Sequence, residues 1–277
     1  MKHLKAALEF YLDSSIHVAV AVCSLVYVTV FEYDLSLDKN LLGFILFATI
    51  SGYNFVKYFG IARFHHRSLT RRLKAIQIFS FFAFGLMLYF AYFLPADLYW
   101  HALALALVTF LYAVPFLGKR TLRMFSGLKI FAVSLVWAAV TVILPVLAVN
   151  EVIDLNVWLT FAQRFIMVIV ITIPFEIRDL RYDSTALGTL PQKLGVNASK
   201  WLAVILMYFG FTLDLFKDEF SCSHIVSFAI TAFVCAFALW GAKKDQKPYY
   251  SSFFVESIPI FWALIFYLLK YYFQISC

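Results

Sequence analysis

The chain has 277 residues, of which 63% are hydrophobic, 19% are aromatic and only 14% are charged, and its formal net charge is +7. A soluble fold of this length has too small an interior to bury so much apolar surface. The composition therefore excludes a soluble globular protein and favours a polytopic membrane protein, and the basic residues, spread over many short connections, give no indication of nucleic-acid binding.

Nine apolar stretches follow one another along the chain, each long enough to cross a bilayer as a helix. Every run is continuous rather than alternating, which favours helices over the strands of a membrane barrel. The runs are Ser14–Val30, Leu41–Phe59, Ile76–Leu94, Leu98–Leu117, Leu128–Val149, Val157–Phe175, Ala198–Phe216, Ile225–Ala242 and Phe253–Phe273. The predicted fold class is all-α: one polytopic membrane bundle of about nine transmembrane helices over residues 1–277.

The basic residues predict the orientation of this bundle. Nineteen of the 23 Lys and Arg residues lie at the N-terminus and in the second, fourth, sixth and eighth connections, whereas the other connections are acidic or bare. Connections rich in Lys and Arg remain in the cytoplasm. We therefore expect an integral protein of the cell (inner) membrane, in contact with membrane lipid, with its N-terminus cytoplasmic and its C-terminus outside.

Polar residues within or beside the runs need partners. We expect His17, Ser14 and Ser15 to form interhelical hydrogen bonds. Glu256, near the inner end of the last run, is expected to pair with a basic residue from an inner connection. Arg164, in the outer part of the sixth run, is expected to reach outward or to pair with Glu151 or Asp154.

Asp179 and Asp183 lie four residues apart at the inner end of the sixth run, so they share one face of a helix. Carboxylates at a membrane surface are costly without a partner and indicate a functional site. The natural partner is Mg²⁺ carrying a phosphorylated ligand, and Arg178 and Lys193 can reach phosphate oxygens. The competing interpretation is a solvated loop of Asp–Arg pairs, each worth about 0–1 kcal/mol.

Two segments carry a family resemblance. Arg178-Asp-x-x-x-Asp183, followed by Gly188-Thr-Leu-Pro191 and Leu194-Gly195, resembles the second aspartate motif of the UbiA superfamily of intramembrane prenyltransferases. The segment from Tyr112 to Arg120 resembles the family's connection after the fourth helix, where a Tyr and basic residues approach the diphosphate. The layout is similar over the whole chain, but the similarity is specific only at residues 112–120 and 176–195.

The resemblance implies one UbiA-like transmembrane domain over residues 1–277, with its helices around a central cavity. The implied chemistry is Mg²⁺-assisted ionisation of an allylic isoprenyl diphosphate, followed by capture of the cation by a hydrophobic acceptor, for which an aromatic quinone precursor is the default. Asp179 and Asp183 would be the catalytic, Mg²⁺-holding residues. The implied diphosphate-binding residues are Arg178, Lys119, Arg120 and Tyr112.

The chain departs from the family at the first motif, Asn-Asp-x-x-Asp-x-x-x-Asp, which belongs at the end of the second run. Asn54 is in place, but the three acids are replaced by Phe55, Tyr58 and Ala62. Either Lys57 and Arg63 bind the diphosphate directly in place of a second Mg²⁺, or ionisation is lost. A third interpretation is that these cations only contact anionic lipid headgroups.

Two functions therefore stay open. One is a UbiA-type prenyltransferase, and the other is a catalytically inactive UbiA-like protein that binds or presents a polyprenyl lipid or assists another membrane enzyme. A transporter is disfavoured because charges gather at one face and are nearly absent from the middle of the runs.

Overall fold

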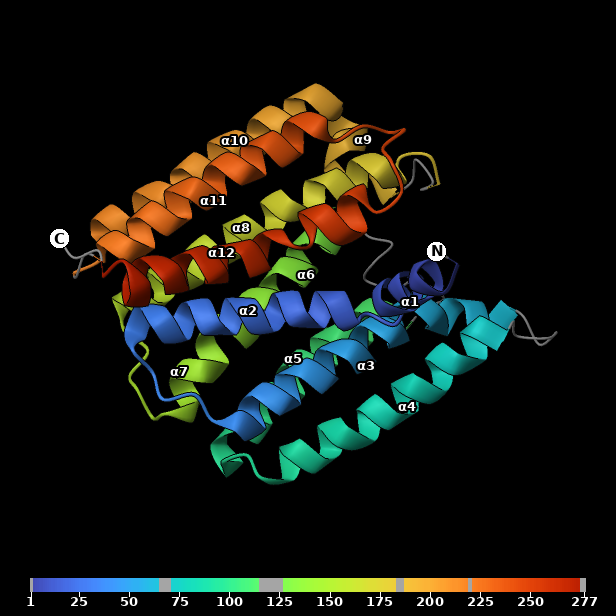
Figure 1. Cartoon of the computed structure of the whole chain (residues 1–277), viewed down its shortest axis with the longest axis horizontal. Helices are drawn as coiled ribbons and strands as arrows, with labels where there is room; N and C mark the ends of the chain where they lie inside the picture. Colours follow the sequence, from blue (N-terminus) through green and yellow to red (C-terminus); the bar gives the residue numbers. More distant parts are fainter. Residues whose placement is uncertain (1, 65–70, 115–126, 183–186, 219–220, 275–277) are drawn as a thin grey trace.

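The structure, a computed structural model, describes residues 2–64, 71–114, 127–182, 187–218 and 221–274. All the regular secondary structure in these ranges is helical (Figure 1). In chain order the α-helices are α1 (Lys2–Asp13), α2 (Ile16–Tyr33), α3 (Lys39–Phe64), α4 (Arg71–Tyr92), α5 (Ala96–Ala113), α6 (Leu128–Ala138), α7 (Leu144–Ala148), α8 (Leu155–Asp179), α9 (Leu190–Leu194), α10 (Val196–Thr212), α11 (Cys222–Gly241) and α12 (Ile258–Tyr267). Short π-helices η2 (Ala139–Ile143), η5 (Tyr250–Val255) and η6 (Leu268–Tyr272) and the 3₁₀-helix η4 (Leu213–Phe216) extend them.

Nine helical stretches in the described ranges are long and apolar enough to span a membrane, and each coincides with one predicted run to within a few residues. The expected all-α membrane bundle is thus confirmed. Helix α8 is the most enclosed of these spans, with 67% of its apolar window buried against its neighbours. It packs against α6, α10, α11 and η5, so its C-terminal end is surrounded by other elements.

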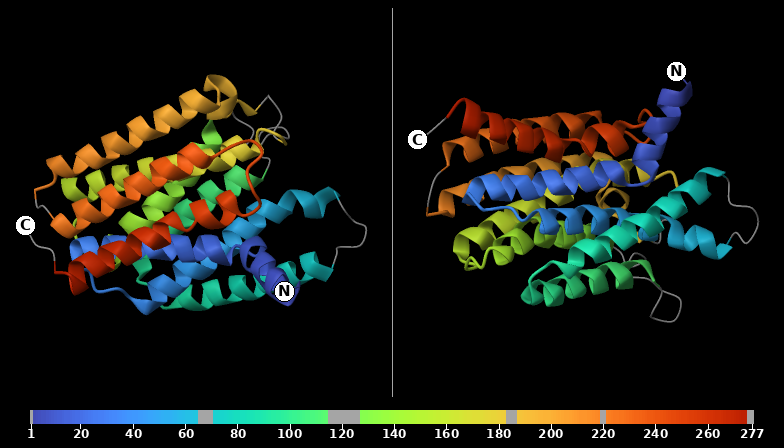
Figure 2. Two further views of the ribbon diagram at one scale, coloured as in Figure 1. Left: turned by 45° about the horizontal axis from the view of Figure 1, so that its top comes forward. Right: turned by 60° about the horizontal axis from the view of Figure 1, so that its bottom comes forward.

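Helix α1, a short helix that precedes the first span, is not among the predicted elements. A residue in the left-handed conformation, Ser15 with φ of 63°, separates α1 from α2. Helix α1 turns away from the bundle (Figure 2) and is held by ion pairs from Arg72 of α4 to Glu9 and Asp13. It lies at the end of the bundle opposite to the C-terminus (Figure 1), as an odd number of spans requires.

Pro145, inside the fifth span, leaves one backbone carbonyl without its helical hydrogen bond. Pro145 has no N–H to donate to the carbonyl of Thr141, four residues earlier, and the π-helix η2 lies at this point. The hydroxyl of Thr29 in α2 instead donates to that carbonyl at 2.7 Å. A side chain from a neighbouring helix thus replaces the missing bond, as membrane helices require.

Helices α3 and α4 pack closely at Gly43, where a Cβ atom would lie 2.8 Å from the ring of Phe90. That ring also stacks on Phe47, with 5.8 Å between centroids, so it has little room to move. Small residues permit such close approach between membrane helices. At Gly85 of α4, by contrast, an added Cβ would meet no atom within 4 Å.

We expect Gly43→Ala and Gly85→Ala to change stability in opposite directions. Alanine favours a helix by about 0.5–1 kcal/mol over glycine, and only Gly85→Ala gains this without a clash. Gly43→Ala is expected to lower the free energy of unfolding by about 1 kcal/mol, measured by denaturant unfolding in detergent. Equal stabilisation by both substitutions would contradict the close α3–α4 contact.

Candidate functional site

The C-terminal end of α8 carries Asp179, which the sequence predicts to bind Mg²⁺. A helix C-terminus has a partial negative charge, so a carboxylate there needs nearby cations. Asp179 Oδ1 accepts a hydrogen bond from Arg178 Nε at 2.8 Å, and Asp179 Oδ2 lies 3.8 Å from Lys129 Nζ at the start of α6. The side chains remain partly open, with 24% of Asp179 exposed. Asp179, Arg178 and Lys129 form what we call the α8-end cluster.

Lys57 lies on α3 near the junction of α1 and α2. Its Nζ donates to Ser15 Oγ at 3.0 Å and approaches the carbonyl of Leu12 at 3.5 Å. The charges acting on it are those of Glu256, Asp13 and Arg178. The charge of Arg178 therefore links Lys57 electrostatically to the α8-end cluster.

Asn54 is fully engaged with protein groups. Its Nδ2 donates to the carbonyl of Ser14 at 3.0 Å and to Ser80 Oγ at 2.9 Å, and its Oδ1 accepts from Ser15 Oγ at 2.8 Å. The side chain is only 2% exposed. These bonds give Asn54 a clear structural role, joining the α1–α2 junction to α3 and α4, whereas its diphosphate-binding role stays a prediction.

Phe55 and Tyr58, which stand where the family's first motif has acids, contact other parts of the protein. The ring of Phe55 stacks on Phe110 of α5, with 6.3 Å between centroids. The hydroxyl of Tyr58 donates to the carbonyl of Asp13 at 2.9 Å. Neither position supplies a metal ligand, so a second Mg²⁺ has no carboxylate from Phe55 or Tyr58.

Glu256 follows the π-helix η5, and such π-turns are frequent at functional sites. Its carboxylate interacts electrostatically with Lys57, Arg178, Tyr11 and Tyr53, which come from α1, α3 and α8. Lys57 and Arg178 are the cations whose charges act on Glu256, and a direct ion pair with either of them stays a prediction. Burial and the nearby carboxylate of Glu256 raise the pKa of Tyr11, so this phenol stays neutral at physiological pH.

A basic cleft of about 310 Å³ adjoins the α8-end cluster. Arg178 and Arg181 line it from the end of α8, and Lys244 and Lys247 line it from the connection after α11. Arg181 also forms an ion pair with Asp245. The cleft suits a phosphate-bearing group because Lys and Arg both bind phosphate oxygens well.

Of the other predicted site residues, the structure describes the side chains of Tyr112 and Lys193. Tyr112 is buried at the end of α5 and interacts with Tyr53, whose hydroxyl accepts a hydrogen bond from Trp137 Nε1 at 2.7 Å. Lys193 is exposed on the short helix α9 and forms none of the ion pairs found among the described residues. Lys119, Arg120 and Asp183 lie outside the described residues. Arg63 belongs to α3, but its side chain is not described.

Sequence reasoning gave no site role to Lys129 or Tyr53. Lys129 is one of several basic residues in the fourth connection, and nothing in the sequence pairs it with Asp179, fifty residues later. Tyr53 directly precedes Asn54 in the place of the first motif, which is the one signal that points to it.

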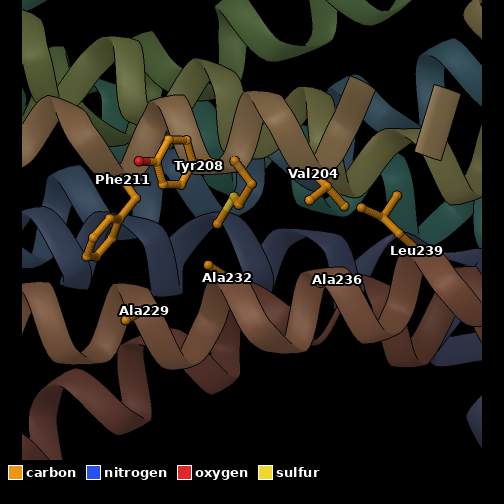
Figure 3. A pocket seen from close by; sticks show the side chains of 8 residues that line it. Val204, Tyr208, Phe211, Ala229, Ala232, Ala236 and Leu239 are labelled. Carbon is orange, nitrogen blue, oxygen red and sulfur yellow. The ribbon is translucent and has the colours of Figure 1, made fainter. Parts of the chain in front are cut away.

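A second cleft of about 310 Å³ lies along the membrane-spanning parts of α10 and α11 (Figure 3). Its lining is almost entirely apolar, with Val204, Phe211 and Leu239 among its residues. It has no charged group and does not share a residue with the basic cleft. This groove therefore offers no charged side chain that could bind a diphosphate.

The arrangement of the helices is the UbiA fold. Three solved structures match over nearly the whole chain. A digeranylgeranylglyceryl phosphate synthase is 19% identical, with a TM-score of 0.56 over 96% of this chain and 98% of that one. A UbiA homologue from Archaeoglobus fulgidus bound to GPP and Mg²⁺ is 12% identical, with a TM-score of 0.57 over 92% of this chain and 98% of that one.

The third structure is a UbiA homologue from the same organism bound to DMAPP and Mg²⁺, 11% identical with a TM-score of 0.56 over 94% of this chain and 98% of that one. No family model and no curated protein matches the sequence. At these identities the likeness establishes the fold, and the function has to be argued from the site.

Asn54→Ala separates a structural role from a ligand-binding one. Removing a buried amide that makes three hydrogen bonds leaves Ser15, Ser80 and the Ser14 carbonyl without that partner, so we expect a loss of about 1–3 kcal/mol in unfolding free energy. The measurement is denaturant unfolding in detergent. Thr49→Ala is the control, because it removes only a bond within α3. Unchanged stability together with weaker diphosphate binding would instead assign Asn54 to the ligand.

Proposed function

We propose that this chain is a UbiA-type integral membrane prenyltransferase that transfers an isoprenyl group from an allylic diphosphate to a lipid-soluble acceptor. The observation that carries the proposal is the α8-end cluster, in which one carboxylate and two cations meet beside a basic cleft. This cluster lies at one end of a bundle whose fold is shared with proteins bound to GPP or DMAPP and Mg²⁺.

The residues of this end fit one magnesium ion rather than two. Magnesium usually takes one or two carboxylates and completes its shell with water and phosphate oxygens. Asp179 would supply one carboxylate, and Asp183 is the second ligand that the sequence predicts. The absence of acids at Phe55 and Tyr58 removes the usual partners of a second ion. When bound, Mg²⁺ would neutralise charge that develops on the leaving diphosphate.

The chain's own cations supply the rest of the charge balance. Arg178 and Lys129 hold the carboxylate of Asp179 and can turn toward phosphate oxygens. Lys57 lies under the influence of Glu256 and Arg178, where it can take the place of the missing second metal. Tyr53, Tyr112 and Trp137 form an aromatic group nearby, suited to an apolar chain or an allylic cation.

The acceptor is a hydrophobic molecule, and an aromatic quinone precursor is the class we propose. A second candidate function is a catalytically inactive relative that binds or presents a polyprenyl lipid or assists another membrane enzyme. The observation that favours it is the use of Phe55 and Tyr58 for packing instead of metal binding.

We propose that the end carrying α1, α9 and the α8-end cluster faces the cytoplasm. The support is the gathering of Lys and Arg at this end. Cys222, at the start of α11 and at the opposite end, is disulfide-bonded, and such bonds persist on the oxidising side of a membrane. The N-terminus is then cytoplasmic and the C-terminus outside.

The first test measures diphosphate release from labelled geranyl, farnesyl and longer diphosphates by purified protein, with and without Mg²⁺. An enzyme releases diphosphate only with the metal, and Asp179→Asn is expected to lower the rate by about a hundredfold or more because it removes a charged ligand. Asp97→Asn, at the opposite end of the bundle, is the matched control and should keep the wild-type rate. Binding without release would favour the inactive relative, and neither binding nor release would refute both functions.

The second test concerns Lys57. If Lys57 replaces a metal as a diphosphate ligand, Lys57→Met should weaken binding of farnesyl diphosphate by about tenfold or more, because a charge-assisted hydrogen bond is lost. Calorimetry in detergent measures the dissociation constant. Lys74→Met is the control, since Lys74 is an exposed cation at the same end of the bundle. If the two substitutions raise the dissociation constant equally, Lys57 contributes only to the overall positive charge of this end and is not a diphosphate ligand.

A further inference from the structure

A group of buried charged residues closes the end of the bundle opposite to the α8-end cluster. It consists of Glu32 at the end of α2, Gln163 in α8, Asp214 in η4, Lys217 just after η4 and His224 in the first turn of α11, and we call it the outer cluster. None of its four ionisable side chains is more than 8% exposed. Five ionisable or polar groups far apart in the sequence thus meet in a place sheltered from water.

Lys217 accounts for only part of the charge in this cluster. Its Nζ donates to Glu32 Oε1 at 2.6 Å and to Gln163 Oε1 at 2.9 Å, and it forms an ion pair with Asp214 Oδ1 at 2.8 Å. An ammonium group has three hydrogens, so these contacts use all of them. Lys217 therefore stays a cation.

Several atoms of the cluster lack hydrogen bonds even so. Among the described residues, Glu32 Oε2, Asp214 Oδ2 and His224 Nε2 have no hydrogen-bond partner, whereas Asp214 Oδ1 is engaged by the ion pair with Lys217. Buried polar atoms without partners are rare and call for an explanation. The three residues are nearly fully enclosed, and one donor atom of each lies close to the others, so a ligand bound between them would satisfy these atoms.

The distances between these atoms suit a metal ion. His224 Nδ1 lies 3.4 Å from Asp214 Oδ1, His224 Nε2 lies 3.6 Å from Glu32 Oε2, and one donor atom from each residue can be chosen so that all lie within 4.8 Å of one another. Such separations are long for hydrogen bonds. One ion can use only one of the two ring nitrogens. Ligand atoms about 2.1 Å from a tetrahedral ion lie about 3.4 Å apart, so either nitrogen-to-oxygen distance suits one pair of its ligands.

The donor types select the class of metal. Imidazole together with carboxylates suits zinc and similar transition metals, whereas Mg²⁺ and Ca²⁺ prefer oxygen alone. The connections at this end also carry acids such as Asp34, Asp154 and Asp218, whose field attracts cations. We propose that Glu32, Asp214 and His224 bind a transition-metal dication such as Zn²⁺, which joins α2, η4 and α11 at the outer end of the bundle.

Lys217 is the competing cation in this proposal. It shares both carboxylates with the site, so its charge weakens metal binding without removing any ligand. This gives the site a signature that a plain salt-bridge network lacks. Removing a ligand should weaken Zn²⁺ binding, whereas removing Lys217 should strengthen it.

The experiment titrates chelator-treated, purified full-length protein with Zn²⁺ and measures stoichiometry and affinity by calorimetry. His65→Gln/His66→Gln serves as the background, because adjacent histidines on a basic connection are another place where zinc can bind. One Zn²⁺ per chain is expected, not displaced by millimolar Mg²⁺. Glu32→Gln and His224→Gln should each weaken binding by about tenfold or more, and Lys217→Met should strengthen it. His101→Gln, at an exposed position at the same end, is the matched control and should bind as the background does.

A second measurement needs no substitution in the cluster. Chelation should lower the midpoint of thermal unfolding, and Zn²⁺ but not Mg²⁺ should restore it, because a ligand that binds only the folded state stabilises it. Absence of stoichiometric Zn²⁺ binding, or equal affinity in Glu32→Gln, His224→Gln and the background, would overturn the proposal. Neither outcome bears on diphosphate release, because that is assayed at the opposite end of the bundle.

Discussion

A bilayer interior has no water to satisfy a charge or an unpaired peptide group, and this constraint organises the whole molecule. Arg164 shows it most clearly. The side chain is only 1% exposed, and its Nη1 donates to the carbonyl of Leu25 at 2.7 Å while its guanidinium lies 4.8 Å from the ring centroid of Trp262. One cation thus joins α2, α8 and α12. The carbonyl freed by Pro145 is satisfied in the same way, by the hydroxyl of Thr29.

The same constraint explains why the junction of α1 and α2 survives without the acids of the family motif. A residue in the left-handed conformation, Ser15, interrupts the helix and leaves polar backbone groups at the membrane edge. Asn54, Lys57 and Tyr58 bind those groups or the adjacent side chain. This segment of α3 therefore holds the junction of α1 and α2 in place.

The spans were predictable because hydropathy is a local property, summed over about twenty residues at a time. His17 was also predicted correctly, since a polar ring in an apolar helix has to find partners, and it does so at the hydroxyl of Tyr11 and the carbonyl of Phe253. The prediction for Arg164 was wrong. It neither reaches outward nor pairs with Glu151 or Asp154, because its partners lie on helices whose packing no local pattern reveals.

Contacts at the candidate site were predictable only where the residues are neighbours in the sequence. Asp179 and Arg178 stand next to each other in the sequence, so the ion pair between them is local. The approach of Lys129 to Asp179, and of Glu256 to Lys57, depends on how α6 and α12 pack around α8 and α3. The outer cluster was hidden for the same reason. Its members are far apart in the sequence, and only the packing of the helices brings them together.

The charged residues at the two ends of the bundle leave imbalances of opposite sign. At the α8 end, Lys and Arg outnumber the carboxylates around the basic cleft, so the proposed diphosphate would complete the charge balance. At the outer end, carboxylate oxygens and an imidazole nitrogen remain after Lys217 has used its hydrogens, so the proposed dication would complete it. Because the interior between the two ends holds few charges, each end has to reach its balance alone. A ligand bound at one end is therefore not required for the other to be complete.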